Sequence, residues 1–124
     1  MRWLTLSNQK QSKYKNKKVT VNGKVFDSKK EAKRYCELIK LEQAGLIKDL
    51  ETQKKFLLLD SFKKNGKTYK QISYHADFVY FDVYSKKTIV EDVKASKNFK
   101  TDVYKIKKKL FEFIYKDLTI KEIY

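Results

Sequence analysis

The sequence lacks most features that crosslink a small protein or anchor it to a membrane. Cys36 is the only cysteine among 124 residues, so it excludes a disulfide framework and a cysteine-based zinc site. No hydrophobic run approaches the length that spans a bilayer, and MRWLTL at the start is too short for a signal-peptide core. Proline is absent and glycine occurs three times. We therefore expect a cytosolic protein with one modest hydrophobic core.

Acidic residues are also few relative to basic ones. The chain has 30 Lys and Arg residues against 15 Asp and Glu residues, which gives a formal net charge of +15. A surface this positive repels itself unless it binds a polyanion, so nucleic acid is the first expected partner. Lysine outnumbers arginine heavily, which favours contacts to phosphate over the reading of base edges. A soluble basic protein without such a partner is the alternative.

Residues 1–18 are predicted to form a mobile basic arm. This segment has six basic residues, no acidic residue and no periodic apolar pattern. Either the arm is a solvated tail or it becomes ordered on phosphate. The lysines assigned to phosphate binding in the second case are Lys15, Lys17 and Lys18. Residues 19–124 are predicted to form a single domain.

That domain has signals for two helices. Ser28 is a suitable N-cap, Glu31 has the capping-box spacing, and Gly45 provides a C-terminal stop. The apolar stripe predicted for this helix consists of Ala32, Tyr35, Cys36 and Ile39. A second helix is expected to begin at Thr101 or Asp102. Its predicted apolar stripe consists of Val103, Ile106, Leu110 and Phe113.

Strands are predicted between and after these helices. Asn22-Gly23 and Asn65-Gly66 mark two-residue turns, and residues 85–87 form another turn. Short links make the first three long strands antiparallel, whereas the second helix allows the last strand to lie parallel to its neighbour. We therefore expect an α/β fold with a mixed four-stranded sheet (α+β mixed) and helices on both faces.

Two aspartates and a lysine occur inside the predicted strands. Side chains alternate along a strand, so Asp92 and Lys94 point to the same face. A turn centred between Ser85 and Lys86 would place Asp77 near Lys94 and within two residues of Asp92. Adjacent carboxylates repel each other unless a cation lies between them, and oxygen-rich pairs suit Mg²⁺ or Mn²⁺. A surface Asp–Lys pair on an exposed sheet face is the alternative.

These residues carry a resemblance to a known superfamily. Asp77 followed by Asp92-Val93-Lys94 resembles the signature of the PD-(D/E)XK nucleases, with Ala76 in place of the proline. The predicted order of elements is similar to the restriction-endonuclease-like αβββαβ core of that superfamily. The segments FDSKKEAKRY, ADFVY and VEDVKA resemble small phage-encoded members of it, and this likeness extends from about Val19 to the end of the chain.

The resemblance implies roles for individual residues. Asp77, Asp92 and the Val93 backbone carbonyl would bind Mg²⁺ or Mn²⁺, and Glu31 matches a further acidic residue of several members. Lys94 would orient the attacking water or stabilise the negative charge that develops on phosphate. The capping box explains Glu31 without any chemistry, and the two interpretations are compatible. The sequence leaves open whether His75 or Gln53 contributes, and Tyr104 is expected in the core.

The lysines after this motif are expected to bind the phosphate backbone. Lys97 and Lys100 follow the third strand, and Lys105, Lys108 and Lys109 share one face of the second helix. The alternative for these helical lysines is a solvated surface without a phosphate partner. Holliday junction resolvases are similar in core and size and act as dimers, so the resemblance favours a homodimeric resolvase of branched phage DNA. The alternatives are a less selective nicking or recombination nuclease, a non-catalytic DNA-binding protein and an RNA-binding phage protein.

Overall fold

A computed structural model describes residues 17–124 and places them in two compact units, with a boundary between Glu37 and Leu38. The boundary falls within helix α2 (Lys29–Gln43). Lys17 and Lys18 are exposed. Lys15 and the rest of the predicted arm lie outside the described residues, so the arm stays a prediction.

The first unit contains the predicted hairpin and the start of the predicted helix. Strands β1 (Val19–Val21) and β2 (Lys24–Phe26) pair antiparallel around Asn22 and Gly23, which have φ values of 51° and 78°. Left-handed backbone at both turn positions is what Asn-Gly favours. Ser28 caps α2, because its Oγ accepts the backbone N–H of Glu31 at 3.1 Å. Both predictions are confirmed.

The buried face of α2 differs in part from the predicted stripe. Ala32 and Tyr35 are buried as expected, but Cys36 is exposed and Leu38 is buried. The buried positions are three residues apart, so the face turns toward Leu38 and leaves Cys36 outside. The prediction for Cys36 was therefore wrong.

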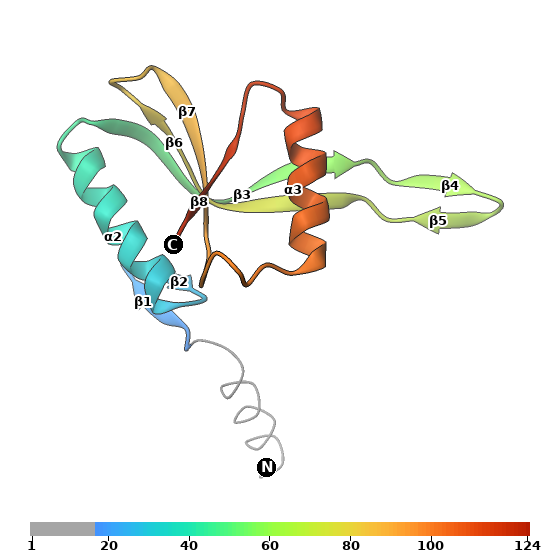
Figure 1. Ribbon diagram of the computed structural model, residues 1–124, viewed down its shortest axis with the longest axis horizontal. Coiled ribbons are helices and arrows are strands. Elements are labelled where there is room, and N and C mark those ends of the chain that lie inside the picture. The colour runs from blue at the N-terminus through green and yellow to red at the C-terminus, as the bar shows by residue number, and fades with distance from the viewer. Residues whose placement is uncertain (1–16) are drawn as a thin grey trace, which may run out of the picture. The chain divides into compact units, whose positions relative to one another are not determined.

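The second unit contains a four-stranded mixed sheet (Figure 1). Its order is β3 (Ile47–Leu59), β6 (Ile72–Asp82), β7 (Lys87–Val93) and β8 (Ile120–Ile123). The first three strands are antiparallel neighbours, and β8 pairs parallel with β7 after helix α3 (Asp102–Ile114). The predicted mixed α+β sheet is confirmed. Whether α2 covers the sheet face opposite α3 stays a prediction.

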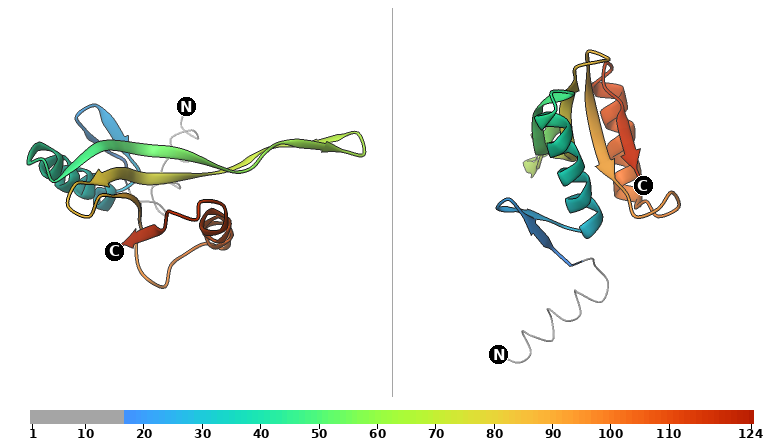
Figure 2. Two further views of the ribbon diagram at one scale, coloured as in Figure 1. Left: turned by 90° about the horizontal axis from the view of Figure 1, so that it is seen from above. Right: turned by 90° about the vertical axis from the view of Figure 1, so that its left-hand side faces the viewer.

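A separate hairpin lies between β3 and β6. Strands β4 (Phe62–Lys64) and β5 (Lys67–Tyr69) form their own two-stranded sheet around Asn65 and Gly66. The left-handed φ values of 52° and 75° at these positions confirm the predicted turn. The hairpin continues the β3–β6 ribbon beyond α3 (Figure 2).

Helix α3 packs on the sheet through aromatic residues. Thr101 caps it by accepting the N–H of Tyr104 at 3.1 Å, as predicted. Tyr104 and Phe111 are buried, and the Phe111 ring meets Phe56 edge-on at 5.0 Å between centroids. Neither described helix has the length and hydrophobicity to span a bilayer.

The apolar stripe predicted for α3 is wrong at three of its four positions, whereas Leu110 packs against the core cluster as predicted. Val103, Ile106 and Phe113 are 61%, 60% and 71% exposed. The exposed set and the buried set, Tyr104 and Phe111, both recur at helical spacing on neighbouring sides of this helix. Periodicity alone does not show which set is buried. The larger aromatic set fills the space over the sheet.

Candidate active site

The register of the β6–β7 hairpin brings the two predicted aspartates opposite each other. Asp82 pairs with Lys87 and Phe78 pairs with Glu91, so the next position in this register places Asp77 against Asp92. The sequence prediction had placed Asp77 near Lys94. The two carboxylates are therefore closer partners than that prediction gave.

The turn explains the difference. Asp82 Oδ1 accepts the backbone N–H groups of Tyr84 at 2.9 Å and Ser85 at 3.3 Å. These bonds turn the chain one residue earlier than a turn centred between Ser85 and Lys86 would. An aspartate that hydrogen-bonds ahead in the chain thus sets the register that aligns the site.

Asp77 joins its strand to both neighbouring strands. Its Oδ2 accepts the backbone N–H of Val93 at 2.7 Å, at the end of β7. Its Oδ1 accepts the side-chain amide of Gln53 on β3 at 3.2 Å. Gln53, whose role the sequence left open, therefore lies beside the candidate site.

The backbone around Gln53 and Asp77 departs from regular β structure. Gln53 has a φ of 54°, a value that is unusual for a residue other than glycine. The ladder runs through Lys54–Ala76 and Thr52–Phe78 without a Gln53–Asp77 pair between them. Such outliers persist where the surrounding structure fixes them, and they gather at functional sites.

The strand β6 also changes face at this point. Strict alternation would put Ala76 and Val79 on opposite faces, yet both pack in the core cluster with Phe111. The side chains of Tyr74 and Tyr80 accordingly reach different neighbours on β7: Tyr74 donates to Asp92, and Tyr80 donates to Glu91. The irregularity separates the candidate site from the buried Glu91.

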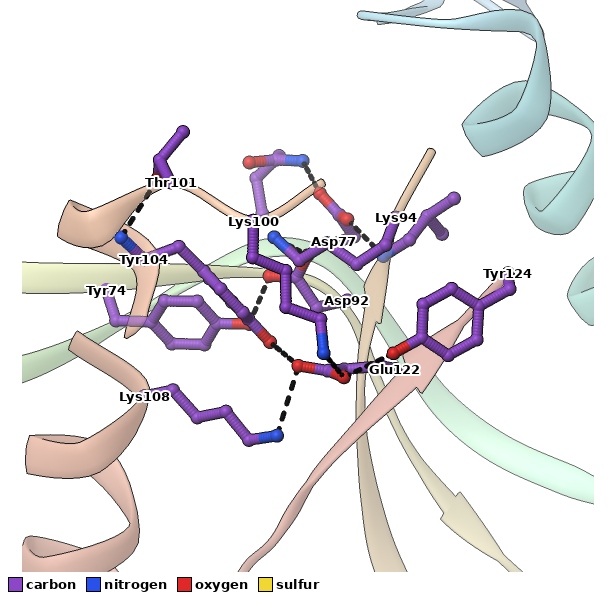
Figure 3. Close-up of polar contacts among 12 residues, drawn as sticks. Tyr74, Asp77, Asp92, Lys94, Lys100, Thr101, Tyr104, Lys108, Glu122 and Tyr124 are labelled. Carbon is purple, nitrogen blue, oxygen red and sulfur yellow. Dashed lines mark hydrogen bonds and ion pairs between the residues drawn. The ribbon is translucent and has the colours of Figure 1, made fainter. Parts of the chain in front are cut away.

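Asp92 and Lys94 form the centre of the site (Figure 3). Lys94 Nζ lies 2.9 Å from Asp92 Oδ1, which confirms that these two side chains share a face. The Tyr74 hydroxyl donates to Asp92 Oδ2 at 2.5 Å. Lys94 Nζ also lies 3.2 Å from the centroid of the Tyr104 ring, a cation–π contact that holds the ammonium over the helix. Tyr104 is thus in the core, as predicted, and at the site.

The electrostatics of this site favour an additional cation. Burial and the negative charge of Asp92 raise the pKa of Asp77 to about 6, and the bonds from Val93 and Gln53 offset this only in part. Burial and the charge of Asp92 also raise the pKa of Tyr74, so its hydroxyl stays protonated and donates. Among residues 17–124, Lys94 forms an ion pair with Asp92, and its charge also lowers the pKa of Asp77. One ammonium beside two carboxylates leaves net negative charge in this part of the structure.

The donor set fits a hard divalent cation. Within residues 17–124, no group of three His, Cys, Asp or Glu side chains gathers in the way that an all-protein metal cage requires. Mg²⁺ does not require one, because it binds through one or two carboxylates and keeps waters or substrate phosphate as its other ligands. Asp77 and Asp92 match that pattern, whereas the Val93 carbonyl as a further ligand stays a prediction.

A second carboxylate, which the sequence analysis did not single out, lies next to Asp92. Glu122 on β8 is the register partner of Asp92. It receives Lys100 Nζ at 2.7 Å and Lys108 Nζ at 3.0 Å, and the Tyr104 and Tyr124 hydroxyls at 2.7 and 2.6 Å (Figure 3). Burial opposes its ionisation, but hydrogen bonds from these four groups hold the pKa of Glu122 well below its ordinary value.

The two missed residues left different signals in the sequence. The parallel crossover was predicted, and it carries Glu122 to the strand beside Asp92. Tyr74 is a tyrosine in an apolar strand, and a buried tyrosine hydroxyl usually has a polar partner. Both signals point to a partner without identifying it.

The remaining predicted residues have different surroundings. Glu31 is buried in the first unit, so its part in a site with Asp77 stays a prediction. Lys100 and Lys108 contact Glu122, whereas Lys97, Lys105 and Lys109 are exposed. Phosphate binding by all five of these lysines also stays a prediction. His75 is exposed on β6 opposite Lys55.

The sequence matches the family described as "Protein of unknown function (DUF1064)" over residues 11–124, so the chain belongs to that family. The matched segment includes Asp77, Asp92 and Lys94. Neither a curated protein nor a solved structure gives a significant match.

Proposed function

We propose that this member of the DUF1064 family is a divalent-metal-dependent DNA endonuclease of the PD-(D/E)XK type that acts on branched DNA of a phage. The observation that carries the proposal is the pair of adjacent carboxylates, Asp77 and Asp92, with Lys94 Nζ 2.9 Å from Asp92 Oδ1. The net charge of +15 supports a polyanionic substrate.

The residues of the site have distinct parts in this proposal. Asp77, Asp92 and the Val93 carbonyl would hold Mg²⁺ or Mn²⁺, with Glu31 as a further candidate. A bound divalent cation supplies a more acidic water and offsets negative charge on the phosphoryl group. The hydroxyl of Tyr74 and the amide of Gln53 hold the two carboxylates in place.

Lys94 would act directly on the reacting groups. Its ammonium is anchored between Asp92 and the Tyr104 ring, so little conformational freedom is lost when it meets a phosphate. From this position it would orient the attacking water and stabilise charge on the phosphate oxygens while water adds to phosphorus and the ester oxygen leaves.

The exposed lysines Lys97, Lys105 and Lys109 would guide the DNA backbone past this site. A four-way junction presents two scissile strands related by a two-fold axis, so the proposal includes a homodimer. It places the protein in the cytoplasm of the phage host cell.

The test of this function is cleavage of a synthetic four-way junction and a matched duplex in Mg²⁺. We expect Asp77→Ala, Asp92→Ala and Lys94→Ala each to reduce cleavage by on the order of a thousandfold or more while DNA binding is largely kept. Glu51→Gln is the matched control, because Glu51 is exposed on the same sheet and pairs with Lys54. Normal Mg²⁺-dependent nicking by Asp92→Ala would contradict the proposal.

The same assay separates the alternatives. Equal rates on junction and duplex favour a less selective nicking or recombination nuclease. Salt-dependent DNA binding without any metal-dependent cleavage by the wild-type protein favours a non-catalytic DNA-binding protein, which the charge of +15 alone would also explain.

A further inference from the structure

The β4–β5 hairpin is the feature that the proposed site does not use. All residues of both strands are exposed, and the hairpin extends the β3–β6 ribbon past α3 (Figures 1 and 2). Its residues add nothing to the core cluster of the second unit. A segment that is ordered but exposed on both faces is consistent with a contact to another molecule.

Positive charge is concentrated on this hairpin. The stretch from Phe62 to Lys70 has four lysines and no acidic residue: Lys63, Lys64, Lys67 and Lys70. Lys64 and Lys67 are register partners, so their side chains lie on the same face directly across from each other. Like charges in this arrangement destabilise a two-stranded ribbon unless an anion lies between them. Among residues 17–124, no acidic side chain forms an ion pair with any of the four lysines.

An aromatic pair stiffens the base of the same face. Phe62 and Tyr69 are register partners whose rings stack at 4.8 Å between centroids with an interplanar angle of 11°. Lys67 Nζ lies 5.1 Å from the centroid of the Tyr69 ring. Cross-strand aromatic pairs stabilise a hairpin that has no core of its own, so they hold the lysines in a fixed position.

We infer that the β4–β5 hairpin is an arm that binds the phosphate backbone of duplex DNA through Lys64 and Lys67. A two-stranded ribbon fits the grooves of B-form DNA, and an ammonium pair on one face matches phosphates along a groove edge. The inference depends on the proposed function only for the choice of DNA as the polyanion. It adds a contact surface away from the carboxylates.

The length of the ribbon sets the reach of this arm. At roughly 3.3 Å per residue, the chain from Asp77 back to Lys67 spans at most about 33 Å. One helical turn of B-form DNA is about 34 Å. The arm would therefore contact the backbone about one turn from the phosphate at the candidate site, and hydroxyl-radical protection at that distance should disappear when the arm lysines are removed.

The experiment compares the full chain with K64A/K67A in binding to a labelled duplex of about three helical turns. Binding is followed by fluorescence anisotropy over a series of salt concentrations with EDTA present, so cleavage does not interfere. Each phosphate contact adds about 0.9 to the slope of log K against log salt, so the slope should fall by about 2 in K64A/K67A. K48A/K87A is the matched control, because both residues are exposed and pair with the far end of β6, Lys48 from β3 and Lys87 from β7.

The outcomes are distinct. A reduced slope in K64A/K67A, with wild-type behaviour in K48A/K87A and unchanged thermal unfolding, supports the arm even if the wild-type protein cleaves no DNA in Mg²⁺. The inference is overturned by equal slopes in the wild type and K64A/K67A, by an equal loss in K48A/K87A, or by no DNA binding at all. It is also overturned if K64A/K67A loses binding to phosphatidylserine vesicles but keeps wild-type DNA binding.

Discussion

Asp92 and Glu122 are register partners on the parallel strands β7 and β8, but the charged groups around them differ. Glu122 receives two ammonium groups and two hydroxyls, and its pKa is lowered. Asp92 and the adjacent Asp77 share the ammonium of Lys94, and the pKa of Asp77 is raised to about 6. The carboxylate of Glu122 thus has two ammonium partners, whereas Asp92 has one that also lies close enough to lower the pKa of Asp77.

The difference separates a structural role from a chemical one. Glu122 connects β8 to α3 and to the loop before it, because its partners Lys108 and Lys100 come from those segments. Its negative charge is compensated within the protein by these two lysines. Among residues 17–124, the charge of Asp77 and Asp92 is compensated only in part, so a further cation would be stabilised beside these two residues.

The largest effect on stability is expected when the carboxylate of Glu122 is removed. Glu122→Gln should lower the free energy of unfolding at neutral pH by roughly 2 kcal/mol, because it leaves Lys100 and Lys108 without their anion. The lowered pKa means that this contribution is present above the ordinary carboxyl pKa of 4.5 and is lost as pH falls below it. Urea unfolding at neutral and acid pH should show the gap between wild type and variant closing at acid pH; a gap that widens would contradict this.

A slightly smaller effect should come from adding a divalent cation. Ca²⁺ at about ten times its Kd should stabilise the wild-type protein by about 1.4 kcal/mol if it binds only the folded state. Thermal unfolding with and without Ca²⁺ measures this without any substrate. Asp92→Asn should lose the shift and Glu122→Gln should keep it. Equal Ca²⁺-induced shifts in the two variants would contradict the assignment of cation binding to Asp92.

Asp77→Asn should have a smaller effect of opposite sign. In EDTA at neutral pH it should raise the free energy of unfolding by about 1 kcal/mol, because it removes a charge that burial and the neighbouring Asp92 disfavour. A raised pKa means that the folded state takes up the proton at higher pH than the unfolded chain does. The penalty is therefore complete above pH 6 and disappears as pH falls toward 3.8. Urea unfolding of both proteins across this range, with Glu51→Gln as the exposed control, is the measurement.

The smallest effects should distinguish the two tyrosines. Tyr74→Phe and Tyr104→Phe each remove one hydroxyl that donates to a carboxylate, Asp92 and Glu122 respectively, and each should cost about 1 kcal/mol. Only Tyr74→Phe should slow cleavage, by roughly tenfold, because Asp92 loses a group that orients it. Tyr104→Phe keeps the ring under Lys94 and should cleave normally. Equal losses of activity would show that both carboxylates take part in the reaction.

Much of the fold and the centre of the site follow from local rules. Strand alternation placed Asp92 and Lys94 on one face, and their 2.9 Å ion pair confirms it. The Asn-Gly turns, the caps at Ser28 and Thr101 and the parallel crossover were also predicted correctly. Each of these depends on interactions between residues close in sequence or on the handedness of connections.

The errors have one local and several tertiary causes. The predicted register was one residue off because Asp82 accepts the N–H groups of Tyr84 and Ser85, a local turn contact that the sequence analysis did not use. The buried face of α3 depends on which aromatic residues the sheet accepts. The left-handed backbone of Gln53 has no signal in the sequence, because glutamine does not favour that conformation.

The bond between Val93 and Asp77 gives the molecule a built-in spectroscopic probe. A backbone amide that donates to a carboxylate at 2.7 Å senses whether that carboxylate is charged, because a bond to an ionised acceptor is stronger. The Val93 amide resonance should therefore move as Asp77 titrates near pH 6 and move again when a cation binds. One peak in a nitrogen–proton correlation spectrum would then report protonation and metal occupancy of the site in solution, without DNA and without turnover.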